Sequence, residues 1–281
     1  MSKIIIHGGF FSESSTNIET KIAKQQALLR IVKDSYAYLQ NHSALETVVY
    51  AVSQLEDDEL FNAGLGSQIQ SDGKIRMSAS LMDGESQKMS GVINIEEVKN
   101  PIQVAQVLMQ VDDRILGGSG ATNFARKHGF EPFSTEIPQR RAEYEAKLAS
   151  LGTGTVGCVA LDNNGKIAVA TSTGGKGFEI PGRISDSATV AGNYANEFCG
   201  VSLTGVGEDI VSGAVATKIV TRVTDGFTLD AAFEKTFNEL KPFDGFAGAI
   251  AIDREGTIFH LDSHPSMVFA SFDGIKEDVF N

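Results

Sequence analysis

The stretch GTGTVGCVAL at residues 152–161 divides the chain into two halves of different character. Before it, residues 140–151 are charged and helical with little apolar stripe, a pattern typical of a surface connector. After it, residues 156–161, the turn at 162–165 and residues 166–171 predict a β-hairpin. Thr155 therefore stands at the first residue of a predicted strand, directly after a flexible Gly-Thr-Gly.

The same stretch satisfies the pattern G-x-G-x-x-G, from Gly152 to Gly157. A dinucleotide site needs a strand before this pattern and a helix after it, because the helix N-terminus faces the pyrophosphate. Here a helix precedes the pattern and a strand follows it, which disfavours nicotinamide or flavin binding. A P-loop pattern is absent from the sequence as well.

Thr155 has a second interpretation, as a nucleophile. Cleavage of the Gly154–Thr155 bond would give Thr155 a free α-amino group on the residue that carries the hydroxyl. Such an amine has a pKa of about 7.7–8, so it can accept the hydroxyl proton near neutral pH. The alternative is a solvent-facing threonine on a strand, with no chemical role.

The composition is that of a folded globular protein: 281 residues, 42% hydrophobic and 21% charged, with a net charge of −12. This acidic balance argues against nucleic acid and anionic membrane surfaces as partners. The two cysteines, Cys158 and Cys199, are expected to be buried thiols of a cytoplasmic protein. The five histidines are scattered, which disfavours a catalytic metal site.

The rest of the chain alternates predicted helices and strands. Residues 18–39 show helical spacing of apolar side chains, and Ser43 with Glu46 forms a capping box for a helix that reaches about residue 55. A helix is predicted to begin at Pro101 and another after Gly120. Further helices are expected at 207–224 and 229–240, and further strands at 3–6, 76–82, 88–96, 188–193, 199–203, 245–252, 257–261 and 266–271.

Several short motifs occur in a fixed order along both halves. The second half contains GTVGCVALD at 154–162, TSTGG at 171–175, GRISDS at 182–187 and TGVGE at 204–208. The first half contains HGG at 7–9, FNAG at 61–64, ASLMDG at 79–84 and GV at 91–92. Together these motifs resemble the isoaspartyl peptidase/L-asparaginase family, the plant-type branch of the N-terminal nucleophile hydrolases. The resemblance covers nearly the whole chain.

The resemblance implies a fold and a maturation step. The implied fold is α+β, a four-layer αββα sandwich formed by a single domain at 1–281. Self-cleavage after Gly154 would yield an α-subunit, 1–154, and a β-subunit, 155–281. The implied assembly is a homo-oligomer, a dimer of αβ heterodimers.

The resemblance also implies roles for individual residues in hydrolysing a β-aspartyl peptide or L-asparagine. Thr155 would be the nucleophile and Thr173 its hydrogen-bonding partner. Arg183 would bind the substrate α-carboxylate, for which a planar fork of donors is suited, and Asp186 would bind the α-ammonium. Thr204 and Gly205 would form the oxyanion hole, and the substrate site would also include Gly207 and Asn62. Without the resemblance, Arg183 and Asp186 would be interpreted as a surface ion pair.

No cofactor is implied for catalysis, but a structural sodium ion is. The loop 55–65 resembles the family's sodium loop, whose ligands are backbone carbonyls, here those of Leu55, Glu56, Asp58, Phe61, Ala63 and Leu65. Oxygen ligands suit a hard cation. The alternative is a plain acidic surface loop.

Four features depart from the family pattern: Ser78 replaces the usual aspartate, the connector before Gly154 is shorter than in many members, and residues 177–180 and 261–267 differ from the usual stretches. These differences border the substrate region and leave two alternatives open. One is a glycosylasparaginase-like amidase, and the other an uncleaved, non-catalytic homologue that acts as a binding or assembly protein. The order of preference between L-asparagine and β-aspartyl dipeptides also stays open, because the two differ only in the leaving group.

Overall fold

The computed structural model describes residues 1–11, 18–146 and 154–281, and their strands form two sheets. The larger sheet has the order β12-β11-β1-β5-β6-β2-β3-β4, and the smaller has the order β10-β9-β8-β7. Neighbouring strands are antiparallel except β3 and β4. The predicted α+β class is confirmed. The strands are β1 Lys3–Phe10, β2 Met77–Asp83, β3 Lys88–Ile95, β4 Ile115–Gly117, β5 Val156–Leu161, β6 Ile167–Thr173, β7 Asn193–Ala195, β8 Cys199–Gly205, β9 Ala247–Asp253, β10 Ile258–Asp262, β11 Met267–Phe272 and β12 Glu277–Val279.

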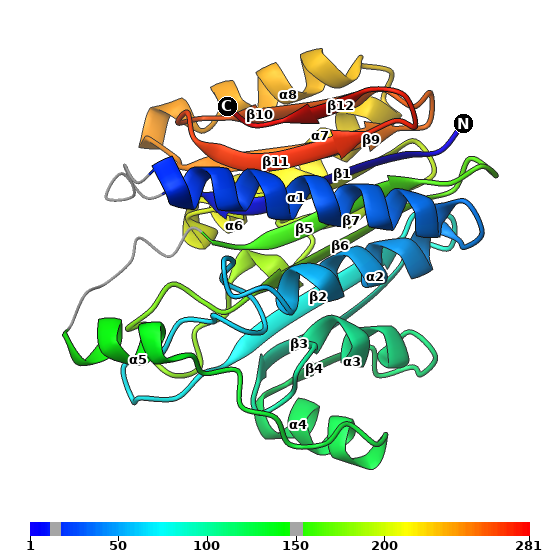
Figure 1. The fold of residues 1–281 in the computed structure, drawn as a ribbon. Coiled ribbons are helices and arrows are strands. Elements are labelled where there is room, and N and C mark those ends of the chain that lie inside the picture. Colours follow the sequence, from blue (N-terminus) through cyan, green and yellow to red (C-terminus); the bar gives the residue numbers. More distant parts are fainter. Residues whose placement is uncertain (12–17, 147–153) are drawn as a thin grey trace.

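Helices cover the outer faces of the two sheets (Figure 1). On the larger sheet, α1 packs on β1 and β11, α2 on β5 and β6, and α3 on β2 and β3. On the smaller sheet, α7 packs on β7 and β8, and α8 on β10. The helices are α1 Ile18–Leu39, α2 Ala44–Glu56, α3 Pro101–Leu108, α4 Gly118–Lys127, α5 Pro138–Glu145, α6 Gly207–Gly213, α7 Val215–Thr224 and α8 Leu229–Asn238, with short 3₁₀ turns η1 Asp186–Ala188 and η2 Lys241–Phe243.

The two sheets also pack against each other. Strand β8 contacts β5 and β6, and β9 contacts β1 and β5. One apolar cluster fills the space around the larger sheet, and a second lies between the smaller sheet and its helices. Strands β5 and β6 read as continuous buried runs because both of their faces are covered.

Most of the predicted elements are confirmed within a few residues. The helix at 18–39 has the predicted bounds, and the Ser43–Glu46 capping box is present at the start of α2. Cys158 and Cys199 are free and buried, as predicted. Helix α5 covers the first part of the helix predicted at 140–151. Positions 147–151 of that prediction lie outside the described residues. Within the described residues, no helix is long and apolar enough to cross a membrane.

Two predictions of elements are wrong. The predicted helix 207–224 is split into α6 and α7 at Ala214, which adopts the left-handed conformation with φ +48°. The split lets the Ala216 N–H donate to the Ala191 carbonyl at 2.8 Å instead of continuing the helix. The predicted strand 188–193 is mostly a turn that follows η1, in which the Thr189 N–H and hydroxyl both donate to the Asp186 carbonyl. The sequence analysis also missed β12.

Candidate active site

Two threonine hydroxyls meet at the end of a strand pair in the larger sheet. Thr155 directly precedes β5 and Thr173 ends β6, and β5 pairs with β6 so that Val156 faces Ser172. The Thr155 hydroxyl donates to Thr173 Oγ1 at 3.3 Å, and Thr155 is only 4% exposed. The Gly175 N–H donates to the same oxygen at 3.2 Å, which fixes Thr173 Oγ1 as an acceptor.

Gly154 lies against Asn62, which explains why a glycine precedes Thr155. A Cβ at position 154 would come within 2.4 Å of Asn62 Cβ, a distance that real side chains do not tolerate. Asn62 itself is held in place, since its amide donates to the Gly175 carbonyl and its oxygen accepts from the Gln68 N–H at 3.0 Å. Asn62 thus lies beside the bond that the sequence analysis predicts to be cut.

The packing of β8 on β5 follows a regular step that leads to Thr204. A Cβ at Gly200 would lie 3.0 Å from Val159, and one at Gly157 would lie 2.0 Å from Ser202. Moving two residues forward on β8 therefore corresponds to moving two residues back on β5. Because residues two apart on a strand share a face, the next step pairs Thr204 with Thr155. The fully buried Thr204 is thus expected to face Thr155 across the two sheets.

Gly205 ends β8 in a conformation that requires glycine. Its φ is +142°, and a Cβ there would lie 2.4 Å from the Phe246 carbonyl oxygen. The backbone at the predicted oxyanion position is therefore set by close main-chain packing rather than by a side chain.

A buried polar layer lies directly behind the threonines, and the sequence analysis did not predict it. We define it as His7, Thr171 and Ser202, all of which are fully buried. His7 Nε2 and Ser202 Oγ are hydrogen-bonded at 2.9 Å, and Ser202 Oγ and Thr171 Oγ1 at 2.7 Å. In the larger sheet His7 and Thr171 both flank Gly157, which leaves room for Ser202.

The buried polar layer is uncharged. Burial lowers the pKa of His7 to about 3, so its imidazole is neutral at physiological pH. The sequence signal for this layer was the spacing of two residues that separates Thr171 from Thr173 and Ser202 from Thr204, which places each pair on one face of its strand.

Arg183, Asp186 and Gly207 form a second cluster, which we call the anchor. A Cβ at Gly207 would lie 2.8 Å from Asp186 Oδ1 and 3.0 Å from Arg183 Nη2, so a cation and a carboxylate face the same glycine. Arg183 pairs with Glu208, through Nε at 2.7 Å and Nη2 at 2.9 Å. The anchor is therefore not the Arg183–Asp186 surface pair of the alternative interpretation.

Asp186 is the electrostatically unusual member of the anchor. It is 2% exposed, and its Oδ2 accepts no hydrogen bond from the residues that the structure describes. Gly192 packs on that oxygen, where a Cβ would lie 2.4 Å away. Burial raises the pKa of Asp186 to about 7, and the nearby Arg183 charge only partly opposes this rise. A buried carboxylate oxygen that accepts no hydrogen bond favours an N–H donor of a ligand, such as an ammonium group.

Two hydrogen bonds and one strand pairing link the anchor to the threonine pair. Asn94 donates its side-chain amide to the Arg183 carbonyl at 3.0 Å, and its N–H donates to Ser78 Oγ at 3.1 Å. Ser78 on β2 faces Thr173 on β6. Ser78, one of the departures from the family pattern, thus lies between the two clusters and not in direct contact with either charge of the anchor.

The loop after α2 folds back on itself. Gly64 and Gly66 have φ values of +56° and +80°, and the Leu65 N–H donates to the Glu56 carbonyl at 2.7 Å. The carbonyls of Leu55 and Asp58 also accept bonds within the loop. A backbone carbonyl oxygen has two lone pairs, so one that accepts a hydrogen bond can still bind a cation. This loop can therefore supply the oxygen ligands that a hard monovalent cation needs.

The Glu56 side chain is not part of this set of carbonyls. It points into the protein, where Oε1 accepts from Ser172 Oγ at 2.6 Å and from the Ile102 N–H at 3.2 Å. Burial raises its pKa to about 8. Among the described residues, no cluster of histidine, cysteine and carboxylate side chains suited to a metal is present.

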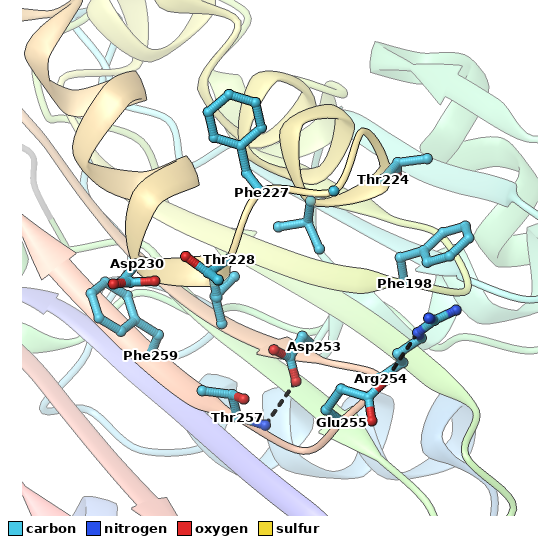
Figure 2. Close-up of a pocket in the computed structure, with 13 residues that line it drawn as sticks. Phe198, Thr224, Phe227, Thr228, Asp230, Asp253, Arg254, Glu255, Thr257 and Phe259 are labelled. Carbon is cyan, nitrogen blue, oxygen red and sulfur yellow. Dashed lines mark hydrogen bonds and ion pairs between the residues drawn. The ribbon is translucent and has the colours of Figure 1, made fainter.

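A cavity of about 590 Å³ lies far from both clusters, at the other end of the smaller sheet (Figure 2). Phe198, Phe227 and Phe259 form its apolar walls. Its charged side chains have partners within the protein. Asp253 accepts from the Thr257 N–H at 2.8 Å, and Arg254 Nε donates to the Glu255 carboxylate at 3.1 Å. None of the predicted site residues lines it, so cavity size does not locate the active site here.

Comparison with known proteins gives a consistent family assignment. A family model described as asparaginase matches residues 1–150 and 133–279. The isoaspartyl peptidase/L-asparaginase of Synechocystis sp. is 44% identical, covering 97% of this chain and 88% of that protein. Its counterpart in Nostoc sp. is 43% identical, with coverages of 98% and 92%. The isoaspartyl peptidase of Escherichia coli is 36% identical, with coverages of 91% and 88%.

Proposed function

The chain belongs to the asparaginase family, and we propose from this that it is an amidohydrolase that acts on β-aspartyl peptides and L-asparagine. The observation that carries the mechanism is the meeting of the Thr155 and Thr173 hydroxyls at 3.3 Å, with Gly154 packed on Asn62. The proposed nucleophile is Thr155, released as an N-terminal residue by self-cleavage of the Gly154–Thr155 bond.

Self-cleavage begins with attack of Thr155 Oγ on the Gly154 carbonyl carbon. The C–N bond of the peptide breaks, the nitrogen takes the hydroxyl proton and becomes the α-amine of Thr155, and an ester links residue 154 to Oγ. Water then hydrolyses the ester and releases the fragment 1–154 from the fragment 155–281. The close fit of Gly154 on Asn62 supports this step, because it holds the carbonyl-bearing residue against a rigid neighbour.

In the mature enzyme the α-amine of Thr155 takes the proton of its own hydroxyl. The oxygen attacks the β-carbonyl carbon of the substrate. The leaving amine then departs with the proton that the α-amine of Thr155 had taken up. The resulting β-aspartyl ester is hydrolysed by water to aspartate. Thr173 keeps the hydroxyl oriented, and Thr204 with the Gly205 N–H stabilises the negative oxygen of the tetrahedral intermediate.

The anchor binds the head group of the substrate. An amino acid carries its carboxylate and its ammonium on one carbon, and Arg183 and Asp186 face one point at Gly207 from two sides. The proposed pairing is Arg183 with the α-carboxylate and Asp186 with the α-ammonium. Asn62 and Gly207 complete the proposed substrate site.

The loop 55–65 is proposed to bind a structural sodium ion through the carbonyls of Leu55, Glu56, Asp58, Phe61, Ala63 and Leu65. The ion would neutralise the carbonyl dipoles and brace the loop that carries Asn62. The folded-back loop with its two left-handed glycines supports this proposal.

Three further features belong to the proposal. The packing of helices on the outer faces of two packed sheets supports a four-layer αββα sandwich, formed as one domain over residues 1–281. The mature enzyme is proposed to be a dimer of αβ heterodimers. Two buried free thiols are compatible with a reducing compartment, and we propose the cytoplasm.

Denaturing mass spectrometry of the purified wild-type protein after prolonged incubation tests the proposal. The expected result is two fragments, of which the smaller begins at Thr155, and release of aspartate from β-aspartyl dipeptides and L-asparagine. An intact 281-residue chain that releases no aspartate would instead support a non-catalytic binding or assembly protein. Activity confined to glycosylated asparagine would support the glycosylasparaginase-like alternative.

A further inference from the structure

Glu208 contacts Arg183 in a manner that the proposed reaction does not use. Its two carboxylate oxygens accept from Arg183 Nε at 2.7 Å and from Nη2 at 2.9 Å, a bidentate pair along one edge of the guanidinium. The Arg183 side chain is 15% exposed, whereas that of Glu208 is 54% exposed. The pair therefore joins a largely buried guanidinium to a carboxylate that reaches it from the surface.

We propose that Glu208 is a positioning residue that holds the guanidinium of Arg183 in the orientation required by the α-carboxylate of the substrate. This inference rests on the proposed function of the anchor. A guanidinium has five N–H donors, and Glu208 engages one on Nε and one on Nη2. The adjacent edge, formed by Nη1 and the second N–H of Nη2, keeps a complete fork for another carboxylate.

The backbone places this remaining fork next to the anchor. Glu208 follows Gly207 directly, and Gly207 is the residue against which Arg183 Nη2 and Asp186 Oδ1 converge. One short segment thus supplies both the floor of the anchor and the carboxylate that fixes its arginine. Freezing the arginine before the substrate arrives reduces the side-chain entropy that binding would otherwise cost.

The charges around the anchor are balanced for a zwitterion. Glu208 offsets Arg183, and Lys176 Nζ lies 3.8 Å from Glu208 Oε1, the oxygen that also accepts from Arg183 Nε. The strong interaction with Arg183 lowers the pKa of Glu208 to about 2, so it is ionised throughout the pH range of any assay. A head group with one positive and one negative charge therefore meets a site of little excess charge.

A competing interpretation gives the opposite result. Glu208 could act as an internal competitor that occupies the fork meant for the substrate carboxylate. Removing a positioning residue weakens substrate binding, whereas removing a competitor tightens it. The direction of the change in KM therefore distinguishes the two.

The experiment compares Glu208→Gln and Glu208→Ala with the wild type, all after completed self-cleavage. For a β-aspartyl dipeptide, KM is expected to rise about tenfold in Glu208→Ala, with kcat within about twofold. Glu208→Gln keeps one acceptor oxygen, so its KM is expected to lie between the wild-type and alanine values. The rate of self-cleavage is expected to be unchanged, because the precursor does not present an α-carboxylate to Arg183.

Glu239→Gln is the matched control. Glu239 also pairs with an arginine that is 15% exposed and with a lysine, Arg222 and Lys218, but it lies at the end of α8 away from the anchor. Its KM and kcat are expected to equal those of the wild type. A lowered or unchanged KM in both Glu208 variants would overturn the proposal.

Calorimetric titration with L-aspartate separates this proposal from that of the activity. Aspartate carries the same zwitterionic head group but needs no turnover, so its binding to the self-cleaved proteins reports the anchor without the reaction. Weaker binding to Glu208→Ala than to the wild type would support the positioning role even if neither protein hydrolysed a β-aspartyl substrate. Equal binding would overturn it, and no binding to either protein would overturn the anchor itself.

Discussion

The threonine pair and the anchor belong to one site but are built in different ways. Thr155 and Thr173 stand at the ends of paired strands and are backed by the uncharged buried polar layer of His7, Thr171 and Ser202. The anchor lies on the 3₁₀ turn η1 and its flanking loop and on the short helix α6, and it consists of charged groups. Register and packing therefore position the reacting groups, whereas charge selects the head group of the substrate.

This contrast predicts that losses in the threonine pair affect every reaction of the protein. Thr155→Ala removes the oxygen that attacks in both self-cleavage and hydrolysis. Both rates are expected to fall by about 10⁴-fold or more, in line with the removal of other enzymatic nucleophiles. Mass spectrometry of the incubated variant and an aspartate-release assay measure the two effects.

Thr155→Ser is the control for this variant, since it keeps the hydroxyl and the α-amine. It is expected to retain measurable cleavage and hydrolysis. Hydrolysis at the wild-type rate in Thr155→Ala would exclude Thr155 as the nucleophile.

Losses in the anchor are expected to affect only the reaction with an external substrate. Arg183→Ala removes the fork for the α-carboxylate and leaves Glu208 and Asp186 without their cation, so KM is expected to rise about 100-fold. Self-cleavage should proceed at nearly the wild-type rate. Steady-state kinetics and the time course of fragment formation measure the two responses.

Arg222→Ala is a suitable comparison, because Arg222 is equally buried and pairs with Glu239 outside the site. It is expected to leave KM unchanged. If Arg183→Ala blocked self-cleavage while Arg222→Ala did not, the arginine would have a structural role in the precursor, and the division between the two clusters would be wrong.

The buried polar layer provides a milder test of the first half of the comparison. Ser202→Ala removes the hydroxyl that joins His7 to Thr171 and leaves buried polar groups unpaired. We expect self-cleavage and kcat to slow about tenfold, with little change in KM, because the strands that carry Thr155, Thr173 and Thr204 lose a shared contact.

Ser90→Ala is the control for the polar layer. Ser90 is equally buried on β3, and its hydroxyl donates to the Ala105 carbonyl at 2.6 Å, away from the threonines. A similar loss of melting temperature in the two variants, with slower catalysis only in Ser202→Ala, would identify a positioning effect. Equal kinetics in both would mean that the layer only stabilises the fold.

The two regions also differ in how well the sequence predicts them. Thr155 and the hairpin at 156–171 are predicted from local signals, the Gly-Thr-Gly stretch and the turn at 162–165, whereas Thr173 is assigned through the resemblance. The Ser43 capping box was found for the same reason. The contacts of Ser202 with His7 and Thr171 could not be found, since they depend on how two sheets pack and join residues up to 195 positions apart.

The anchor shows a different limit. Arg183, Asp186 and Gly207 are assigned through a resemblance, but residues 188–193 are predicted as a strand, which the structure does not show. In the structure, the buried Asp186 is enclosed by Gly192 and Gly207, and the chain turns at Thr189 to bring Gly192 there. The pairing of Glu208 with Arg183 joins residues 25 positions apart and has no local signal either.

A pH dependence is also expected, and it appears in KM and not in kcat. Asp186 has its pKa raised to about 7 by burial, so it is ionised above pH 7 and protonated below it. Only the ionised carboxylate attracts the α-ammonium of the substrate, and kcat/KM is therefore expected to fall with each pH unit below 7, approaching tenfold per unit.

The α-amine of Thr155 also titrates near neutral pH, but protonating it impairs the attack and so lowers kcat as well. Profiles of both parameters separate the two groups, because kcat reports the substrate complex and kcat/KM the free enzyme. Asp186→Asn should bind substrate weakly at all pH values. Its KM should no longer rise at acidic pH, whereas its kcat should still fall there. If KM still rose at acidic pH in Asp186→Asn, the titrating group would lie outside the anchor. Selection of the substrate head group by charge would then rest on Arg183 alone.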